Sequence, residues 1–540
     1  AYAGTTGVLL AFDIEAPRRA GLLGFAIERT GGNRPQEFLP AMVSFAEAAH
    51  TPGELIATDT APVQRFRWSD YRVYPGTSYS YTVHPVYGTP TALDLQPGPT
   101  VAVTTSSATE GEHRVLFNRA AGASQAFSRD FPEVAELLKN APKKGEVELP
   151  PRALAWLSRG SLEQITGFIA RAVDPTWALD VAIYEFELPA IVQALDAARE
   201  RGVDVRIVYH AKPKDPQTAQ NEQSLVGWPA EITRARVTNK ICHDKFIVLS
   251  RIDAQKRSPR AVLCGSTNFT PNGVYRQANV VHIIRRPDVA RTYLRLFEVL
   301  FSGATPAETK AWIDANNPLS PDEPLVVGFS PRSGEVDLDL FVSEIGKAHR
   351  DVLFCTAFDL NDRLESALLG APHDDILRLG LQNSRSKITG YHRDRTADFN
   401  ATAFLKDPLD GFLRESTAGQ RGNILIHTKL LVVDFTSDAP TVISGSHNLS
   451  ASASGGNDEN FLILRGNTDV ADCYGVELMR LYEHYRFRWH VKQDGKQGGP
   501  PDPCPRAAGT LCPDDRWTKP YFEDGTLPAL DRVRFAGAPA

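Results

Sequence analysis

The sequence predicts an α/β protein in which two duplicated α/β/α halves pack pseudo-symmetrically and are preceded by an all-β sandwich domain. Three observations predict this class. Short strands separated by turns fill residues 1–105, a strand–helix–strand pattern follows in residues 151–320, and the same pattern returns in residues 321–492. Residues 106–150 are expected to form a connector, and residues 493–540 a C-terminal tail.

The composition is that of an ordinary globular protein. The 540 residues are 42% hydrophobic and 23% charged, which is enough for about three domains with cores of their own. The net charge of −6 provides no global basic field for nucleic acid or an anionic membrane, although a local basic groove is compatible with it. No uncharged apolar run approaches the ~20 residues of a membrane span, so no transmembrane segment is predicted. We expect a monomer.

The sequence contains only weak signals for the cellular compartment. No signal peptide is visible, and the first residue, Ala1, is compatible with both methionine excision and signal cleavage. A cytoplasmic location is expected, with secretion as the alternative. Cys504 and Cys512 flank a loop with Pro and Gly and can pair. No Cys/His cluster has the spacing of a zinc site, and no metal or other cofactor is predicted.

Residues 1–105 have the pattern of a β-sandwich. About seven short apolar or alternating runs are separated by turn residues such as Pro75-Gly76. The segment from Tyr74 to Tyr81 resembles the corner before a late strand of a fibronectin type III domain. A module of this kind is more often a spacer or a docking domain than a catalyst.

The two later regions share a βαβ pattern. Residues 178–186 are predicted to form a strand, residues 188–201 an amphipathic helix closed by Gly202, and residues 203–210 the next, parallel strand. The same succession recurs in residues 351–381. The repetition indicates an internal duplication, and two such halves tend to face each other across a pseudo-two-fold axis.

Each half carries the same short motif. The first half has His243-Asp244-Lys245 followed by Gly265-Ser266-Thr267-Asn268, and the second has His427-Thr428-Lys429 followed by Gly445-Ser446-His447-Asn448. His and Lys are two residues apart at the start of a strand, so both side chains leave the same face. Each Gly-Ser-x-Asn ends the next strand, where backbone N–H groups and small polar side chains can converge on an anion.

These residue types suit phosphoryl transfer through a covalent intermediate. Two Lys, two Ser and two Asn can neutralise the non-bridging oxygens of a phosphodiester as charge builds up in the transition state. One neutral His can attack phosphorus, while the other, protonated, donates a proton to the leaving oxygen and then activates water. This chemistry requires no metal.

The complete pattern is too specific to be accidental. A lone His is more often structural than catalytic, and a lone Gly-Ser-x-Asn is usually a turn. One copy of the full pattern is expected by chance in roughly one chain in a hundred, and two copies in about one in ten thousand. Both copies also lie at the same place in the duplicated unit. We therefore interpret the eight residues as one catalytic site.

The paired motifs resemble those of the phospholipase D superfamily, whose hallmark is His-x-Lys-x(4)-Asp with Gly-Ser-x-Asn downstream. The resemblance covers about residues 151–492 and is more specific for fold and mechanism than for substrate. It implies that His243 and His427 serve as nucleophile and general acid/base. It also implies that six further residues bind phosphate: Lys245, Lys429, Ser266, Ser446, Asn268 and Asn448.

One position departs from the family pattern. The second motif ends in Asp434, but the first has Ser250 at that place. In the family this Asp supports the fold behind the site. Ser250 is therefore expected to weaken a structural contact without abolishing catalysis, and Asp253 is placed to compensate. If the Asp were essential, the first half would have lost its catalytic function and the predicted activity would be absent.

A second asymmetry bears on the roles of the two histidines. Asp458-Glu459-Asn460 follows the second motif, and Gln277-Ala278-Asn279 is the corresponding stretch of the first. In the family an acidic residue near this point hydrogen-bonds a catalytic His, often that of the other half. If Glu459 reaches His243, it fixes the tautomer and raises the basicity of that ring. His243 is then the nucleophile, and His427, without an equivalent carboxylate, the acid.

The ends of the first strands of each half are expected to line the mouth of the site. Tyr184, Phe186 and Phe358 lie there, with Glu185 and Asp359 beside them. In one interpretation these residues shape the substrate pocket. Core packing explains the aromatic residues equally well.

The predicted reaction is hydrolysis, or alcohol exchange, at a phosphodiester. The first hypothesis is a phospholipase D-type enzyme that removes the head group of a phospholipid, in keeping with the acidic net charge. The second is a metal-independent nuclease of the same superfamily, with nucleic acid as the partner. The third is a catalytically inactive binding protein, which the retention of all eight motif residues disfavours.

Overall fold

The computed structural model has the predicted α/β class with a β-rich N-terminal region. It describes the chain except for residues 49–53, 120–123, 135, 137–147, 359, 371–373, 383–389, 392–396, 402–425, 494–503, 505–509 and 538–540. Among the described helices, none is long and apolar enough to cross a membrane.

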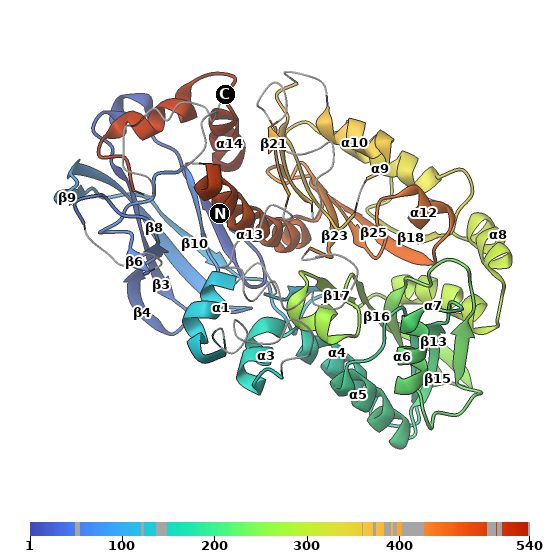
Figure 1. Cartoon of the computed structure of the whole chain (residues 1–540). Helices are drawn as coiled ribbons and strands as arrows, with labels where there is room; N and C mark the ends of the chain where they lie inside the picture. The colour runs from blue at the N-terminus through green and yellow to red at the C-terminus, as the bar shows by residue number, and fades with distance from the viewer. Residues whose placement is uncertain are drawn as a thin grey trace.

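The N-terminal region is a β domain with two main sheets, drawn in blue in Figure 1. One sheet has the strand order β1-β2-β7, and the other has the order β10-β8-β3-β4 with β9 paired to β8. Leu10 of the first sheet and Phe25 of the second belong to the same buried core. The elements are β1 (Tyr2–Ala3), β2 (Val8–Ala11), η1 (Ala16–Arg19), β3 (Gly24–Gly31), β4 (Arg34–Phe38), β5 (Pro40–Ala41), β6 (Ile56–Ala57), β7 (Arg67–Asp70), β8 (Ser78–Thr89), β9 (Ala92–Leu95) and β10 (Thr100–Thr104).

Tyr79, near the start of β8, anchors a corner of this domain. Its hydroxyl accepts a hydrogen bond from the backbone N–H of Tyr74 at 2.9 Å. This is the geometry of a tyrosine corner before a late strand of a β-sandwich. The closer resemblance to a fibronectin type III domain stays a prediction.

The first half is built on a seven-stranded sheet with the order β11-β17-β16-β15-β12-β13-β14. β12 and β13 pair in parallel because helix α5 carries the chain back between them. β12 is buried after Trp177, and its charged residue, Asp180, is paired with Arg206 and Arg257. The elements are β11 (His113–Phe117), α1 (Ser124–Asp130), α3 (Pro151–Ser158), α4 (Ser161–Ala170), β12 (Trp177–Ile183), α5 (Pro189–Glu200), β13 (Asp204–His210), α6 (Pro216–Ser224), β14 (Thr233–Arg236), β15 (Lys245–Asp253), β16 (Lys256–Gly265), η3 (Asn272–Arg276), β17 (Val280–Ile284), α7 (Pro287–Phe301) and α8 (Pro306–Asn316).

The second half repeats this sheet with the order β18-β25-β24-β23-β19-β20-β22-β21. β18 takes the place of β11, β23 that of β15, β19 that of β12 and β22 that of β14, while β21 is an addition. The duplication predicted from the sequence is therefore confirmed. The elements are β18 (Leu325–Ser330), α9 (Val336–Gly346), β19 (Asp351–Thr356), α10 (Asp362–Leu369), β20 (Leu377–Gln382), β21 (Gly390–Tyr391), β22 (Ala397–Ala401), β23 (Lys429–Val433), β24 (Thr441–Gly445), α12 (Ala451–Gly455), β25 (Glu459–Arg465), α13 (Thr468–Gln493), η6 (Asp515–Phe522) and α14 (Leu527–Ala536).

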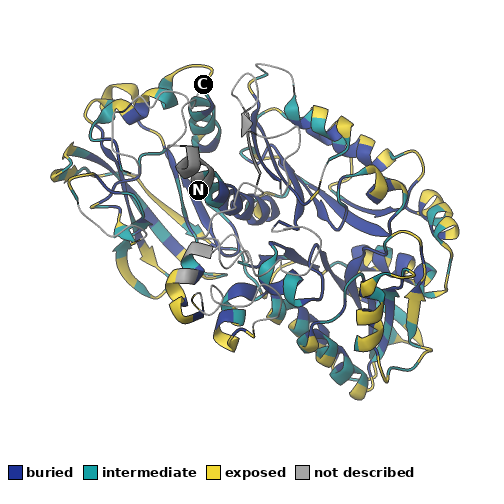
Figure 2. Ribbon diagram, in the orientation of Figure 1, coloured by how far each residue is buried: buried dark blue, intermediate teal, exposed yellow. Residues whose placement is uncertain are grey.

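The two sheets share one large core, which also holds helices α7 and α13. α4 and α5 cover the other face of the first sheet, and α9 and α10 cover the other face of the second. Figure 2 shows the strands of both halves mainly as buried and the outer helices with exposed faces. Each sheet is thus covered on both faces, as strands with continuous apolar runs require.

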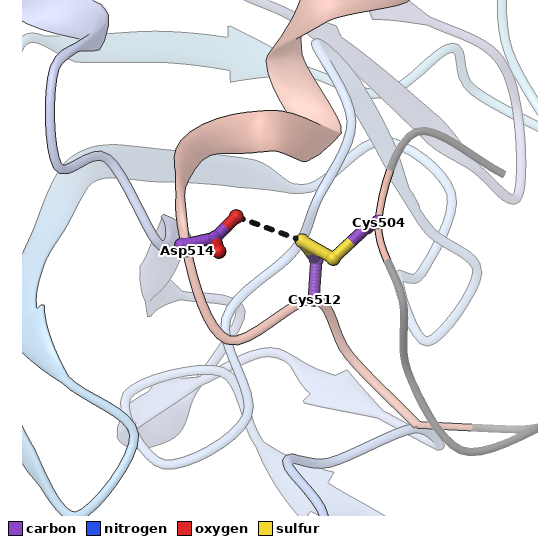
Figure 3. A group of neighbouring side chains, drawn as sticks. All are labelled: Cys504, Cys512 and Asp514. Atoms are coloured by element: carbon purple, nitrogen blue, oxygen red, sulfur yellow. Dashed lines mark hydrogen bonds between the residues drawn. A yellow bond between two sulfur atoms is a disulfide. The ribbon is translucent and has the colours of Figure 1, made fainter.

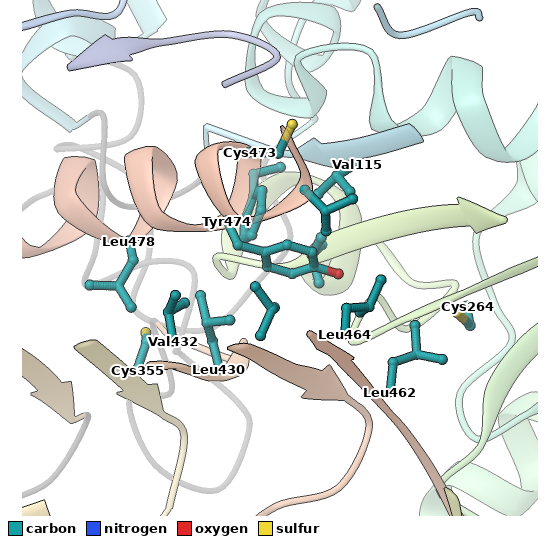
Figure 4. Close-up of a cluster of buried hydrophobic side chains, with 14 of the residues drawn as sticks. Val115, Cys264, Cys355, Leu430, Val432, Leu462, Leu464, Cys473, Tyr474 and Leu478 are labelled. Atoms are coloured by element: carbon teal, nitrogen blue, oxygen red, sulfur yellow. The ribbon is translucent and has the colours of Figure 1, made fainter. Parts of the chain in front are cut away.

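Helix α13 fills the centre of the molecule. Figure 4 shows Tyr474 and Leu478 of this helix in one cluster with Leu430 and Val432 of β23. The cluster also contains Val115 of β11. α13 therefore ties the second sheet to the edge strand of the first.

The segment 106–150 is more than the connector that the sequence predicts. It contains β11, which pairs antiparallel with β17 at the edge of the first sheet. β11 is short, and its partner lies far along the chain, so local pattern alone does not reveal the pairing.

The C-terminal tail lies against the β domain. Trp517 of η6 is buried beside Phe25, and its indole N–H donates to the backbone carbonyl of Leu22 at 2.8 Å. Cys504 and Cys512 form a disulfide, as their flanking positions in the sequence allow. The tail is thus attached to the first domain by packing and hydrogen bonds, and its disulfide closes a loop within the tail itself.

Candidate active site

The two motif histidines meet at the interface of the halves. The ring centroids of His243 and His427 are 6.1 Å apart. The backbone N–H of His243 donates to the carbonyl of Asp458 at 2.8 Å, and that of His427 donates to the carbonyl of Ala278 at 3.0 Å. Each motif is therefore held by backbone of the opposite half, which gives the site its pseudo-two-fold symmetry.

His243 forms a pair with a carboxylate of the second half. Its Nδ1 lies 2.6 Å from Oε2 of Glu459, and both side chains are buried. Burial lowers the pKa of His243 to about 4, against the opposing effect of Glu459. Burial acts to raise the pKa of Glu459, but the contact with His243 keeps it below its usual value. A neutral ring therefore donates its Nδ1–H to a carboxylate, which leaves Nε2 with a free lone pair.

His427 has a neutral partner instead. Its Nδ1 lies 3.0 Å from Oδ1 of Asn279 and 3.2 Å from the carbonyl of Ser266. Both partners are acceptors, so Nδ1 carries a proton and Nε2 is the free nitrogen. Burial and the charge of Lys429 hold the pKa of His427 well below its usual value.

Asn279 is the structural counterpart of Glu459, which corrects the sequence alignment by one residue. Ser446 donates its hydroxyl to Glu459, and Ser266 donates its hydroxyl to Asn279, both at 2.8 Å. In the sequence, Ala278 aligns with Glu459, because Asn279 aligns with Asn460, the residue that follows Glu459. The pairing of each Ser with the adjacent strand, visible only in the fold, sets the true register.

The two motif lysines lie buried beside the rings. Nζ of Lys245 donates to the carbonyl of His243, and Nζ of Lys429 donates to the carbonyl of His427, both at 2.6 Å. Burial is the main cause that lowers the pKa of Lys245 to about 8 and the pKa of Lys429 well below its usual value. An anion bound between two such ammonium groups would offset this cost, since it supplies the missing opposite charge.

The four Ser and Asn residues divide into two kinds. The hydroxyls of Ser266 and Ser446 orient the partners of the histidines, which differs from the phosphate-binding role that the resemblance implies. Asn268 donates its Nδ2–H to Glu185, and Oδ1 of both Asn268 and Asn448 is buried without a hydrogen-bond partner among the described residues. Because Oδ1 is an acceptor, a contact of either amide with phosphate has to come from an Nδ2–H.

Asp434 supports the second half from behind. Its carboxylate accepts the backbone N–H groups of His349 and Arg350 in the turn before β19. In the first half, Ser250 makes no such bond, and Asp253 does not compensate, because it is exposed and lies 3.4 Å from Arg260. The corresponding turn is instead capped from within by Asp174, which accepts the backbone N–H of Thr176.

The aromatic residues at the strand ends differ in role. The ring of Tyr184 lies 5.1 Å from that of His243, so it lines the site. Phe186 is fully buried, as the core-packing interpretation predicts, and its backbone forms a β-bridge with Phe269. Phe358 is partly exposed, with its ring 6.0 Å from Nζ of Lys429. Asp359 lies outside the described residues.

One cluster of potential metal ligands lies in the described part of the chain, away from this site. It consists of Cys504, Cys512 and Asp514 (Figure 3). The two sulfurs are bonded to each other, so they cannot act as thiolate ligands. The cluster therefore does not fit a metal.

Duplicated α/β halves that bring two His–Lys pairs together at one buried centre define a class of phosphoryl-transfer proteins. Residues 169–301 match the sequence model of a family described as cardiolipin synthase, PLD-like domain. This match and the paired motifs support an assignment to the phospholipase D superfamily. No curated protein sequence matches the chain.

Several solved structures resemble parts of the chain. Phosphatidylserine synthase from Haemophilus influenzae Rd KW20 is 12% identical over 65% of this chain and 90% of its own, with a TM-score of 0.42. Polyphosphate kinase from Porphyromonas gingivalis is 12% identical over 56% of this chain, which spans only 43% of the kinase, with a TM-score of 0.40. Nuc, a phospholipase D family member from Salmonella typhimurium, is 25% identical over 26% of this chain and 84% of its own, with a TM-score of 0.21.

Proposed function

We propose that the protein is a phosphodiesterase of phospholipase D type, which hydrolyses a phospholipid head-group diester or transfers the phosphatidyl group to an alcohol. One observation carries the proposal. Two buried imidazoles with free Nε2 atoms face each other, and a carboxylate orients His243 while an amide orients His427. That difference assigns distinct chemical roles to the two rings.

In the first step, Nε2 of His243 attacks phosphorus and the bond from phosphorus to the leaving oxygen breaks. His427, protonated in the complex, donates its Nε2 proton to that oxygen. The bound diester favours this protonation because its negative charge opposes the effect of Lys429 on the ring. Lys245, Lys429 and the amides of Asn268 and Asn448 neutralise the non-bridging oxygens.

In the second step, the phosphorus–nitrogen bond of phospho-His243 breaks. Neutral His427 takes a proton from water, and the resulting hydroxide attacks phosphorus. An alcohol in place of water gives the exchange product. The cycle returns both rings to their starting protonation states.

A two-substrate assay tests the proposal. Phosphatidylcholine vesicles and single-stranded DNA are offered to the wild type and to His243→Ala and His427→Ala. We expect lipid hydrolysis that both substitutions abolish, with a phospho-histidine trapped on His243 in the wild type. Cleavage of DNA alone would favour a nuclease, and binding without turnover of either substrate would favour an inactive binding protein.

A further inference from the structure

A carboxylate of the first half lies among the cationic groups of the site. Glu185 follows β12 directly after Tyr184. Its Oε2 accepts a hydrogen bond from Nδ2 of Asn268 at 2.5 Å. Its Oε1 has no donor among the residues that the structure describes, and the side chain is only half-buried. One carboxylate oxygen is thus free beside a candidate phosphate-binding amide.

Among the residues that the structure describes in the second half, the position that corresponds to Glu185 carries no carboxylate. Phe246 and Leu430 each follow the motif lysine, and they pair with Ala182 and Cys355 respectively. Ala182 and Cys355 are therefore equivalent positions. Three residues further along the chain, Phe358 occupies the position that corresponds to Glu185. Asn448 accordingly has no carboxylate partner among the described residues. In the described part of the site, a carboxylate therefore stands beside Asn268 and none stands beside Asn448.

The charges at the centre explain what this asymmetry favours. Lys245 and Lys429 are matched by Glu459 and Glu185, and the proton that His427 gains in the complex matches the charge of the phosphate. A positive group on the head group then finds the free carboxylate oxygen of Glu185 next to its phosphate, whereas a second anionic group finds no unmatched positive charge.

We propose that Glu185 is a specificity-determining residue, which makes the site select a diester that carries a positively charged group on its head group. The inference rests on the proposed function and names its substrate class. Selection works in both directions, because the carboxylate attracts an ammonium group and repels a second anion.

Short-chain lipids that differ only in the head group test this selection. Dihexanoyl phosphatidylcholine is zwitterionic, dihexanoyl phosphatidylglycerol is anionic, and bis(p-nitrophenyl) phosphate reports on the basal chemistry. In Glu185→Gln, the hydrogen bond to Asn268 is retained and the charge is lost. We expect kcat/KM for phosphatidylcholine to fall about tenfold while that for phosphatidylglycerol stays equal or rises.

Glu187→Gln is the matched control. It removes the same charge two residues away and leaves the carboxylate of Glu185 and its hydrogen bond from Asn268 in place. The ratio of the two lipids should then change by less than about twofold. Glu185→Asp keeps the charge and should keep the preference for phosphatidylcholine.

The pH dependence provides a readout that a structural role would not move. Burial raises the pKa of Glu185 to about 7, against the effect of Lys245. The charged groups that face it are Lys245, Lys429 and Glu187. As pH rises through 7 the carboxyl ionises, so the preference of the wild type for phosphatidylcholine should increase from about pH 6 to 8 and stay flat in Glu185→Gln. Titration of Lys245 or Lys429 should affect both lipids alike, because these lysines act on the phosphate that both lipids carry.

The outcomes separate the two proposals. A wild type that turns over none of the three substrates contradicts the proposed function and this inference with it. A wild type that is active, with a head-group ratio unchanged in Glu185→Gln, overturns the inference alone. An equal loss on all three substrates would make Glu185 a positioning residue for Asn268 and would also overturn it.

Discussion

At the scale of single residues, the two halves differ where symmetry would place identical groups. Glu459 faces His243, whereas Asn279 faces His427. A carboxylate stabilises the imidazolium that develops as a ring is alkylated or phosphorylated, and an amide does not. The two rings of the near-symmetric fold thus have chemically different partners, and the roles proposed for them rest on this difference.

Glu459→Gln tests this assignment. The amide keeps the shape of the site but removes the charge behind His243, so we expect the rate of phospho-enzyme formation to fall about a hundredfold or more. Rapid-quench measurement with a chromogenic diester gives this rate. Asn279→Asp is the counterpart, and it should slow phospho-enzyme formation far less. Peptide mapping that finds the label on His427 would reverse the roles.

Asp244 predicts a pH dependence of stability. It accepts a hydrogen bond from Asn460 at 2.8 Å, its Oδ2 has no partner among the described residues, and burial raises its pKa to about 8. The folded protein keeps a proton that the unfolded chain releases above about pH 4, so the free energy of unfolding falls between about pH 4 and 8. Asp244→Asn, which stays neutral, should raise Tm by about 3 °C or more at pH 8 and little at pH 4 in thermal scans. An equal Tm difference at both pH values would contradict this.

At the scale of elements, the site depends on strand ends that exchange backbone bonds across the pseudo-two-fold axis. Two isolated β-bridges join the halves, one between Cys242 and Asp458 and the other between Ala278 and Ile426. The residues that follow these four positions are His243, Glu459, Asn279 and His427. The C-terminus of β14 adds a side-chain link, because the guanidinium of Arg236 binds both carboxylate oxygens of Asp458 at 2.8 Å. The same residues therefore determine the register of these strand ends and the contact between the two halves.

The Arg236–Asp458 pair gives a prediction at this scale. Both groups are buried, so removing one charge leaves the other without its partner. Asp458→Leu and Arg236→Met should each lower the free energy of unfolding by about 3–5 kcal/mol, whereas the double variant Arg236→Met/Asp458→Leu should lose less than the sum of the two. Urea denaturation of these two single variants and the double variant measures the coupling. Additive losses would show that the pair does not act as a unit.

At the scale of the whole molecule, the C-terminal tail connects the ends of the chain. Trp517 packs on Phe66 in the core of the β domain, and α14 contacts the second half through Arg534, whose guanidinium donates to the carbonyl of Arg350. The β domain is in this way attached to the catalytic halves at the tail as well as at β11.

Trp517→Ala tests the structural role of the tail. Loss of the buried indole should cost the β domain about 3 kcal/mol or more, because a large cavity replaces it. Calorimetry should show an earlier unfolding transition for this domain. kcat on bis(p-nitrophenyl) phosphate should remain within about twofold of the wild type. A matching loss of kcat would indicate that the β domain contributes to the catalytic centre.

Much of the fold follows from local pattern. The alternation in residues 1–105 and the repeated βαβ units predict the β domain and the duplicated halves, since burial imposes its period on each strand and helix. The pairing of β11 with β17 was not predictable, because it depends on contact between segments that no local signal connects. The cap by Asp174 is a local bond to Thr176, but only the fold shows that this turn corresponds to the one that Asp434 supports in the second half.

For the site, the sequence by itself determined the residue types: two His, two Lys, two Ser and two Asn at repeated positions, and one Glu in the second half alone. Only the tertiary structure decided their partners. It placed Asn279 and not Ala278 behind His427, assigned the two Ser hydroxyls to orientation, and brought Glu185 to Asn268. Local chemistry is encoded residue by residue, whereas the partner of each polar group depends on how two distant strands come into register.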